Sequence, residues 1–183
     1  ENCLKVNNKP VIFVDHKFDN LIEFSCSNAS LFGLGETIQD ALDSYENSFE
    51  GFSTYSPSLK SSPISNPVNW NYFNNILSSR NMIFVPSISP GVNASAFNIQ
   101  LSHFSRSRKN GKYYDLQWKY ALDSSSKIIL INSFNNWFYG TVIEPVENSV
   151  KFSLNNDIWA GNDSFYFLQQ TKKWIQQFQH EEM

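Results

Sequence analysis

Five short apolar segments, separated by stretches with helical periodicity, constrain the fold of this chain more than any other feature of its sequence. Each segment has the length and apolar content of a buried strand. The predicted strands are Pro10–Val14, Leu31–Leu34, Gly51–Tyr55, Met82–Ser87 and Lys127–Asn132. Because strands and helices alternate, we expect the α/β class, with a parallel sheet joined by right-handed crossovers.

Four helices are predicted between or after these strands. They are Thr37–Ser48, Asn69–Arg80, Tyr114–Asp123 and Ser164–Gln179. The first begins with a capping residue, and its apolar positions are Ile38, Ala41, Leu42 and Tyr45. On the last, the shared face is predicted to carry Phe165, Leu168, Thr171, Lys172 and Ile175. The Ser- and Pro-rich stretch Pro57–Pro67 is predicted to be a loop, so residues 1–183 form a single domain.

The segment Ser133–Pro145 follows the last predicted strand and resembles a loop of glycoside hydrolase family 99, the endo-α-1,2-mannosidases. The family pattern is Ser-Phe-Asn-Glu-Trp-His-Glu-Gly-Thr-Gln-Ile-Glu. The residues that agree are Ser133, Phe134, Asn135, Trp137, Gly140, Thr141, Ile143 and Glu144. The two catalytic glutamates of that pattern do not agree, because Asn136 and Tyr139 occupy their places. The resemblance therefore implies the family scaffold without its catalytic pair.

Four other segments resemble the same family, in the same order along the chain. Arg106–Tyr114 reads Arg-Ser-Arg-Lys-Asn-Gly-Lys-Tyr-Tyr and is similar to the family sequence Arg-Asn-Arg-Ile-Asn-Gly-Lys-Tyr-Tyr. The other three are Lys5–Val11, Phe49–Tyr55 and Ile83–Gly91. With the loop, these segments extend the resemblance over nearly the whole chain, up to about Asn148.

The family fold implied by this resemblance is an eight-stranded (β/α) barrel. The five predicted strands would correspond to its fourth to eighth strands, so three strands are missing. Five such strands cannot close a barrel. We expect a partial barrel that is completed by another chain, such as the other half of a cleaved precursor, or an open sheet covered by a partner; a trimmed sequence is the third alternative.

In such barrels the site lies at the carboxyl ends of the strands. The resemblance implies no catalytic residue at Asn136 or Tyr139, because an amide takes up no proton near neutral pH and a phenol ordinarily ionises near pH 10. The substrate-binding residues it implies are Tyr55, Arg106, Trp137 and Glu144, with Arg108 as an alternative to Arg106. Further aromatic candidates are Phe138, Tyr139 and Trp159. The candidate carboxylates to replace the catalytic pair are Asp15, Glu36, Glu144 and Glu147, for each of which we favour a cap or a hydrogen bond within a loop.

Composition excludes several classes of partner and cofactor. A net charge of -3 and a pI near 5.6 argue against nucleic acid as the main partner. The basic cluster from His103 to Lys112 is most simply a solvated loop. No apolar run approaches the roughly 18 residues of a membrane span. The histidines His16, His103 and His180 are scattered without metal-ligand spacing, so we expect no metal and no cofactor.

Two features bear on the compartment. Cys3 and Cys26 can pair in an oxidising environment. Glycosylation sequons occur at Asn28, Asn93 and Asn162, and the chain begins at Glu1 without a signal-like segment, as a processed or trimmed chain would. The resemblance implies the secretory pathway, in the Golgi lumen or outside the cell.

Three hypotheses for function follow. The first is a family 99-like module that has lost catalysis and binds an α-mannose-containing glycan or serves a structural role. The second is an active endo-α-mannosidase that processes N-glycans with displaced carboxylates. The third is a structural subunit of a larger assembly that no longer binds sugar. Turnover of a mannoside separates the second hypothesis from the others, and affinity for mannosides separates the first from the third.

Overall fold

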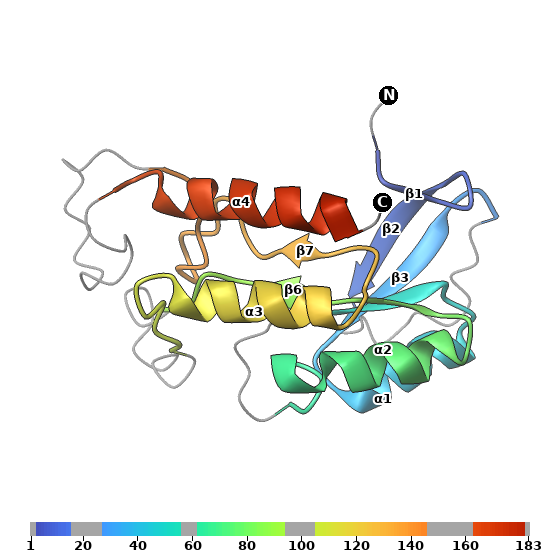
Figure 1. Ribbon diagram of the computed structural model, residues 1–183. Helices are drawn as coiled ribbons and strands as arrows, with labels where there is room; N and C mark the ends of the chain where they lie inside the picture. Colours follow the sequence, from blue (N-terminus) through green and yellow to red (C-terminus); the bar gives the residue numbers. More distant parts are fainter. Residues whose placement is uncertain (1–2, 16–26, 56–61, 94–104, 146–162, 182–183) are drawn as a thin grey trace. The chain divides into compact units, whose positions relative to one another are not determined.

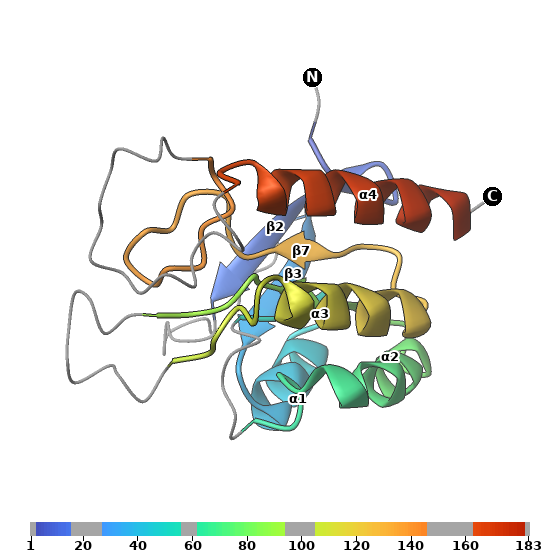
Figure 2. The same cartoon turned by 60° about the vertical axis from the view of Figure 1, so that its left-hand side comes forward.

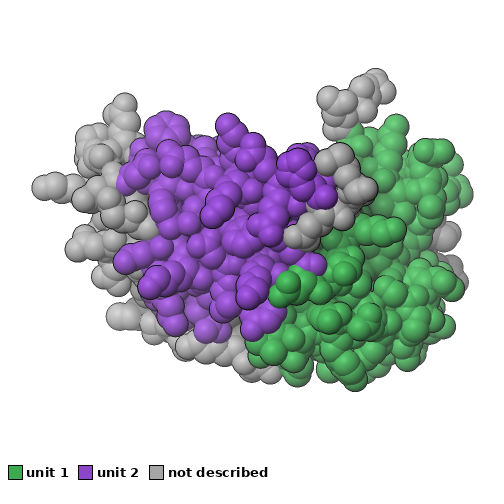
Figure 3. All heavy atoms as spheres, in the orientation of Figure 1, with its two compact units in different colours: residues 1–87, 123–130 green, residues 88–122, 131–183 purple. Residues whose placement is uncertain are grey.

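The computed structural model describes residues 3–15, 27–55, 62–93, 105–145 and 163–181. The chain divides into two compact units (Figure 3). Unit 1 comprises residues 1–87 and 123–130, and unit 2 comprises residues 88–122 and 131–183.

Unit 1 contains a five-stranded sheet in the order β1-β2-β3-β4-β5 (Figure 1). Its strands are β1 (Lys5–Val6), β2 (Lys9–Asp15), β3 (Ser30–Gly35), β4 (Gly51–Thr54) and β5 (Ile83–Val85). The strands from β2 to β5 run parallel, whereas β1 turns back on β2 as an antiparallel hairpin. The predicted parallel α/β sheet is therefore confirmed.

Two helices of unit 1 cover this sheet. Helix α1 (Ile38–Glu46) packs on β3 and β4, and helix α2 (Trp70–Ser78), preceded by the 3₁₀ turn η1 (Pro67–Asn69), packs on β5 (Figure 1). Helix α1 begins where expected, because the Thr37 hydroxyl accepts a hydrogen bond from the amide of Asp40 while the Asp40 carboxylate accepts one from the amide of Thr37. The largest buried side chains of unit 1 are aromatic and include Phe32, Phe52, Trp70, Phe73 and Phe84.

The predicted apolar face of α1 was largely wrong. Ala41 is buried, but Ile38, Leu42 and Tyr45 are 44%, 38% and 47% exposed, and the second buried residue is Ser44. The residues that α1 buries, Ala41 and Ser44, therefore both have small side chains. The hydroxyl of Ser44 remains satisfied by donating a hydrogen bond to the carbonyl of Asp40.

The last two predicted strands are shorter and differently paired than expected. Pro86 divides Met82–Ser87 into β5 and β6 (Ser87–Ile88), because proline has no N–H to continue the ladder. Of Lys127–Asn132, only β7 (Leu130–Ile131) is a strand. It pairs with β6 in a separate two-stranded sheet. The amides of Leu130 and Asn132 donate to the carbonyls of Pro86 and Ile88, so the two strands run parallel.

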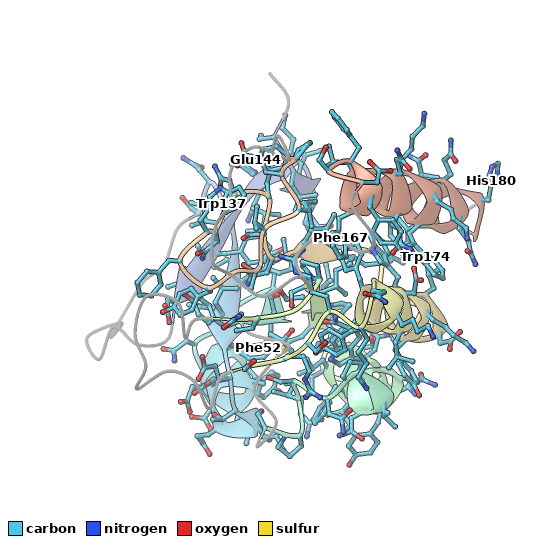
Figure 4. All side chains as sticks on the ribbon, turned by 90° about the vertical axis from the view of Figure 1, so that its left-hand side faces the viewer. Phe52, Trp137, Glu144, Phe167, Trp174 and His180 are labelled. Atoms are coloured by element: carbon cyan, nitrogen blue, oxygen red, sulfur yellow. The ribbon has the colours of Figure 1, made fainter. Side chains whose placement is uncertain are left out.

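Unit 2 is built on two helices, α3 (Lys112–Asp123) and α4 (Tyr166–Glu181), which lie side by side (Figures 1 and 2). The indoles of Trp118 and Trp174 stack with their centroids 6.3 Å apart. Trp174 also donates to the carboxylate of Asp115 over 2.7 Å, so it lies between the helices, whereas His180 points away near the end of α4 (Figure 4). Aromatic stacking and a charged hydrogen bond thus join α3 to α4.

The buried face of α4 also differs from the prediction. Thr171 is buried as expected, but Phe165 and Ile175 are 54% and 38% exposed, and Phe167 is fully buried. Thr171 donates its only proton to the carbonyl of Phe167, so Tyr114 is the donor in the hydrogen bond that joins the two hydroxyl groups. Burial raises the pKa of Tyr114 to about 12, which keeps this donor protonated. A helical-periodicity argument ranks side chains by hydrophobicity and cannot anticipate such a buried polar pair.

Candidate functional site

The loop after β7, residues 133–145, folds back on itself in unit 2. The amide of Ser133 donates to the carbonyl of Thr141, and the amide of Ile143 returns a hydrogen bond to the carbonyl of Ser133. The hydroxyl groups of Ser133 and Thr141 lie 2.8 Å apart, and that of Ser133 also accepts from the amide of Asn136. These hydrogen bonds close the base of the loop and leave residues 136–139 at its tip.

Asn136 acts as a turn-closing residue at this tip. Its side-chain oxygen accepts a hydrogen bond from the amide of Tyr139 over 3.1 Å, as asparagine often does in turns. Tyr139 itself is 42% exposed, and its ring meets that of Phe138 edge to face at 5.0 Å. The carboxamide is thus bound to the backbone, while two aromatic rings stand at the surface.

Trp137 and Glu144 face one another across the loop (Figure 4). The indole Nε1 donates to the carboxylate Oε2 over 3.0 Å, and both side chains are half-buried. The interpretation of Glu144 as a hydrogen-bonding residue within its loop is confirmed. Its carboxylate orients the indole ring.

Two neighbouring segments of unit 2 hold the return half of the loop. The amide of Asn93 donates to the carbonyl of Tyr139 over 2.9 Å. The guanidinium of Arg108 donates to the carbonyls of Gly140 and Val142 over 2.7 and 2.8 Å. Gly140 has a φ of +62°, and a Cβ there would lie 3.1 Å from the carbonyl oxygen of Asn93, so only glycine suits this position.

The basic cluster before α3 is not simply a solvated loop. Arg108 is buried, and its guanidinium donates hydrogen bonds to two backbone carbonyls of the protein. Its approach to a sugar stays a prediction. Arg106 is partly exposed and pairs with Val92 in an antiparallel bridge. Its guanidinium carbon lies 5.2 Å from the centre of the Tyr113 ring, and burial raises the pKa of that phenol while Arg106 opposes the shift.

Other predicted site residues lie in unit 1 or outside the described residues. Tyr55 follows β4, is 37% exposed, and donates its amide to the carbonyl of Gly35. Asp15 ends β2, and Glu36 immediately follows β3. The carboxylate cap at the start of α1 comes from Asp40, which accepts the amide of Glu36. Glu147, Trp159, His16 and His103 lie outside the described residues.

Two of the three predicted glycosylation positions lie among the described residues. Asn28 is exposed in the turn before β3, Asn93 is half-buried, and Asn162 lies outside the described residues. Cys3 is exposed, and its predicted partner Cys26 lies outside the described residues. In the described ranges, no three His, Cys, Asp or Glu side chains gather as a metal site would require. No described helix is long and apolar enough to cross a membrane.

Sequence reasoning missed the anchoring role of Arg108 and Asn93. A weak signal was present in the pair Asn110-Gly111, which is typical of a turn. These residues have positive φ angles of 52° and 82°, and their turn sets the position of Arg108 just before α3. Nothing in the sequence connects Arg108 to carbonyls more than 30 positions away.

Comparison with known proteins identifies the family. The model of glycosyl hydrolase family 99 matches residues 25–180. A glycoprotein endo-alpha-1,2-mannosidase-like protein of Mus musculus is 34% identical over 131 residues, and the glycoprotein endo-alpha-1,2-mannosidase of Rattus norvegicus is 32% identical over 142 residues. These matches cover 71% and 77% of this chain but only 29% and 30% of the relatives.

Solved structures agree with the sequence comparison. The GH99 endo-alpha-mannosidase of Bacteroides thetaiotaomicron, in complex with bis-tris-propane, superposes with a TM-score of 0.85 and 27% identity. The match covers 98% of this chain and 60% of that chain. A second structure of the bacterial enzyme gives a TM-score of 0.82. The chain therefore belongs to glycosyl hydrolase family 99, and its fold is part of the family's (β/α) barrel.

Proposed function

We propose that this chain is a family 99 domain that has lost hydrolytic chemistry and binds α-mannose-containing glycans through the loop 133–145. The observation that carries the proposal is the tip of this loop, where a carboxamide bound to the backbone and an exposed phenol stand at Asn136 and Tyr139. The proposal also rests on the resemblance of the loop to the family pattern, in which glutamates stand at these two positions.

The chemistry of the tip supports binding rather than hydrolysis. Glycosidic cleavage requires groups that exchange protons near neutral pH. The amide of Asn136 donates and accepts hydrogen bonds but takes up no proton there. The nearest replacement by sequence, Glu144, already accepts the hydrogen bond of the Trp137 indole.

Sugar binding needs apolar ring faces and hydrogen-bonding groups side by side. Phe138 and Tyr139 expose their rings at the tip, and Trp137 is held in one orientation by Glu144. The apolar face of a mannose ring would pack on such side chains, while amides contact its hydroxyl groups. Tyr55 and Arg106 are further proposed contacts.

Binding without turnover is the expected result for the protein mixed with α-1,2- and α-1,3-linked mannose or glucosyl-mannose oligosaccharides. We expect Trp137→Ala to cost roughly 1–3 kcal/mol of binding free energy, because it removes a large apolar contact. Titration calorimetry at millimolar sugar measures this difference.

Two variants control this experiment. Glu144→Gln keeps an acceptor oxygen for the indole and should weaken binding less than Trp137→Ala does. Tyr72→Ala on helix α2 removes an exposed aromatic ring of unit 1 and should leave binding unchanged. If the unaltered protein binds no mannose-containing glycan at millimolar concentration, the proposal fails. The hypothesis of a structural subunit that no longer binds sugar then takes its place.

We further propose that another chain, or further segments of the same protein, supply the missing barrel strands. Among the described residues, β1 covers only the first part of β2, and Ile12 of β2 is 42% exposed. Unpaired strand edges promote association. We expect isolated residues 1–183 to sediment as species larger than a monomer; a monodisperse monomer with a cooperative melting transition would contradict this.

The proposed location is the secretory pathway, in the Golgi lumen or outside the cell. The names of the relatives describe enzymes acting on glycoproteins, which supports this location. Glycosylation is proposed at Asn28, Asn93 and Asn162. A loss of mass after enzymatic removal of N-glycans from protein secreted by its own cells tests both proposals, and an unchanged mass contradicts the modification.

A further inference from the structure

Arg108 is a buried cation at the centre of unit 2. The residue is only 4% exposed, although it lies in a basic segment next to a turn. One guanidinium nitrogen, Nη2, donates to the carbonyl oxygens of both Gly140 and Val142. Because such a nitrogen carries two hydrogen atoms, each carbonyl receives one of them.

The same guanidinium lies over the ring of Phe167 on helix α4. Its central carbon is 4.7 Å from the centre of the Phe167 ring, a cation–π contact. Phe167 is fully buried and meets the ring of Tyr114 on helix α3 edge to face. The guanidinium therefore contacts the buried ring of Phe167, while its Nη2 atom binds the loop.

The backbone of Arg108 is fixed as tightly as its side chain. Its carbonyl accepts the amides of Gly111 and Tyr113 at the start of α3. In the turn that these hydrogen bonds close, Lys109, Asn110 and Gly111 all have positive φ. The backbone of this turn is therefore restricted to few conformations. A Cβ at Gly111 would meet the phenol of Tyr166, which closes this turn against α4.

We propose that Arg108 is the positioning residue of the loop 133–145 and determines where the tip carrying Asn136, Trp137 and Tyr139 stands. Gly140 and Val142 form the return half of the loop, and the carbonyl of Tyr139 is held beside them by Asn93. With these carbonyls fixed, the indole of Trp137 meets the carboxylate of Glu144. The link to glycan affinity rests on the proposed function, whereas the link to loop geometry does not.

Arginine suits this role better than lysine. Its planar group presents two N–H bonds to the carbonyls while its delocalised charge lies over the ring of Phe167. A lysine ammonium is compact and strongly hydrated, so it cannot offer both contacts at once. Arg108→Lys is therefore expected to keep the charge but only part of the loop geometry.

The test compares Arg108→Met, Arg108→Lys and Lys112→Met. Lys112 is an exposed cation four residues away, so its replacement makes the same change in charge without touching the loop. The readout is the indole N–H signal of Trp137 in nitrogen-15 NMR spectra, assigned with Trp137→Phe. In Arg108→Met we expect the chemical shift of this signal to move to that of a solvent-exposed indole. The shift should move part of the way in Arg108→Lys and remain unchanged in Lys112→Met.

A loss of overall stability is distinguished from a local effect by the indole signals of Trp118 and Trp174, which should stay in place. Hydrogen bonds to a charged group are worth enough for Arg108→Met to weaken glycan binding by about 10- to 100-fold. If the unaltered protein binds no glycan, only the proposed function fails, because the indole signals still report on the loop.

A measurement on the unaltered protein covers the case in which Arg108→Met does not fold. The guanidinium N–H signals of Arg108 should exchange slowly with water, since the group is buried and bonded to two carbonyls. Rapid exchange, or a Trp137 signal unmoved in a folded Arg108→Met protein, would overturn the proposal.

Discussion

In an assay for endo-α-mannosidase activity, this protein should turn over substrate several orders of magnitude more slowly than an active family member. A positioned general acid or base typically contributes about 10²–10⁴ to the rate, and we propose that Asn136 and Tyr139 stand where the family pattern has two glutamates. The structure adds a reason, because the Asn136 side-chain oxygen is already bound to the amide of Tyr139. A fluorogenic α-mannobiose-type substrate, followed from mildly acidic to neutral pH, measures the rate.

The control for this experiment is Glu144→Gln, which removes the carboxylate closest in sequence to the tip. Trace activity from a contaminating hydrolase would be the same in both proteins. Sustained release that scales with protein concentration and disappears in Glu144→Gln would overturn the loss of catalysis. That result would identify Glu144 as a displaced catalytic group and favour an active mannosidase.

Phe167→Ala should destabilise the protein by about 3–5 kcal/mol, the usual cost of removing a buried phenylalanine ring. Phe167 is fully buried, and its ring meets those of Tyr114 and Tyr166 at 5.9 and 5.2 Å. Its loss also exposes the face of the Arg108 guanidinium, which lies 4.7 Å from the ring centre. Urea unfolding followed by circular dichroism measures the change in the free energy of unfolding.

Phe165→Ala provides the matched control, because it makes the same chemical change two positions earlier. Phe165 is 54% exposed, so its removal should change the free energy of unfolding by no more than about 0.5–1 kcal/mol. Equal effects of the two substitutions would contradict the observed orientation of α4. A larger effect of Phe165→Ala would indicate that α4 buries the face carrying Phe165, as helical periodicity predicts.

Local sequence signals predicted the elements of this fold well. The apolar segment around Ile12 and the capping residue Thr37 lie where a strand and a helix were expected. Such signals succeed because strand formation and helix capping depend on residues that are neighbours in the chain. The separation of β5 from β6 at Pro86 has an equally local cause, although the prediction treated this segment as one strand.

The sequence by itself determined the family and the chemical groups at the tip of the loop. The segments that resemble the family occur in the same order along the chain, and the sequence determines that Asn136, Trp137 and Tyr139 supply the side chains at the tip. Asn136 also closes a turn with Tyr139, which is a contact between near neighbours.

Only the tertiary structure decided which residues hold that loop in place and which face of each helix is buried. Arg108 binds carbonyls 32 and 34 positions away, and Thr171 bonds to Tyr114 across 57 positions. Periodicity ranks the faces of a helix by hydrophobicity alone, so it favoured Phe165 over Phe167 on α4. The burial of a charge or a hydroxyl depends on partners brought together by the fold, and no window of the sequence contains both members of such a pair.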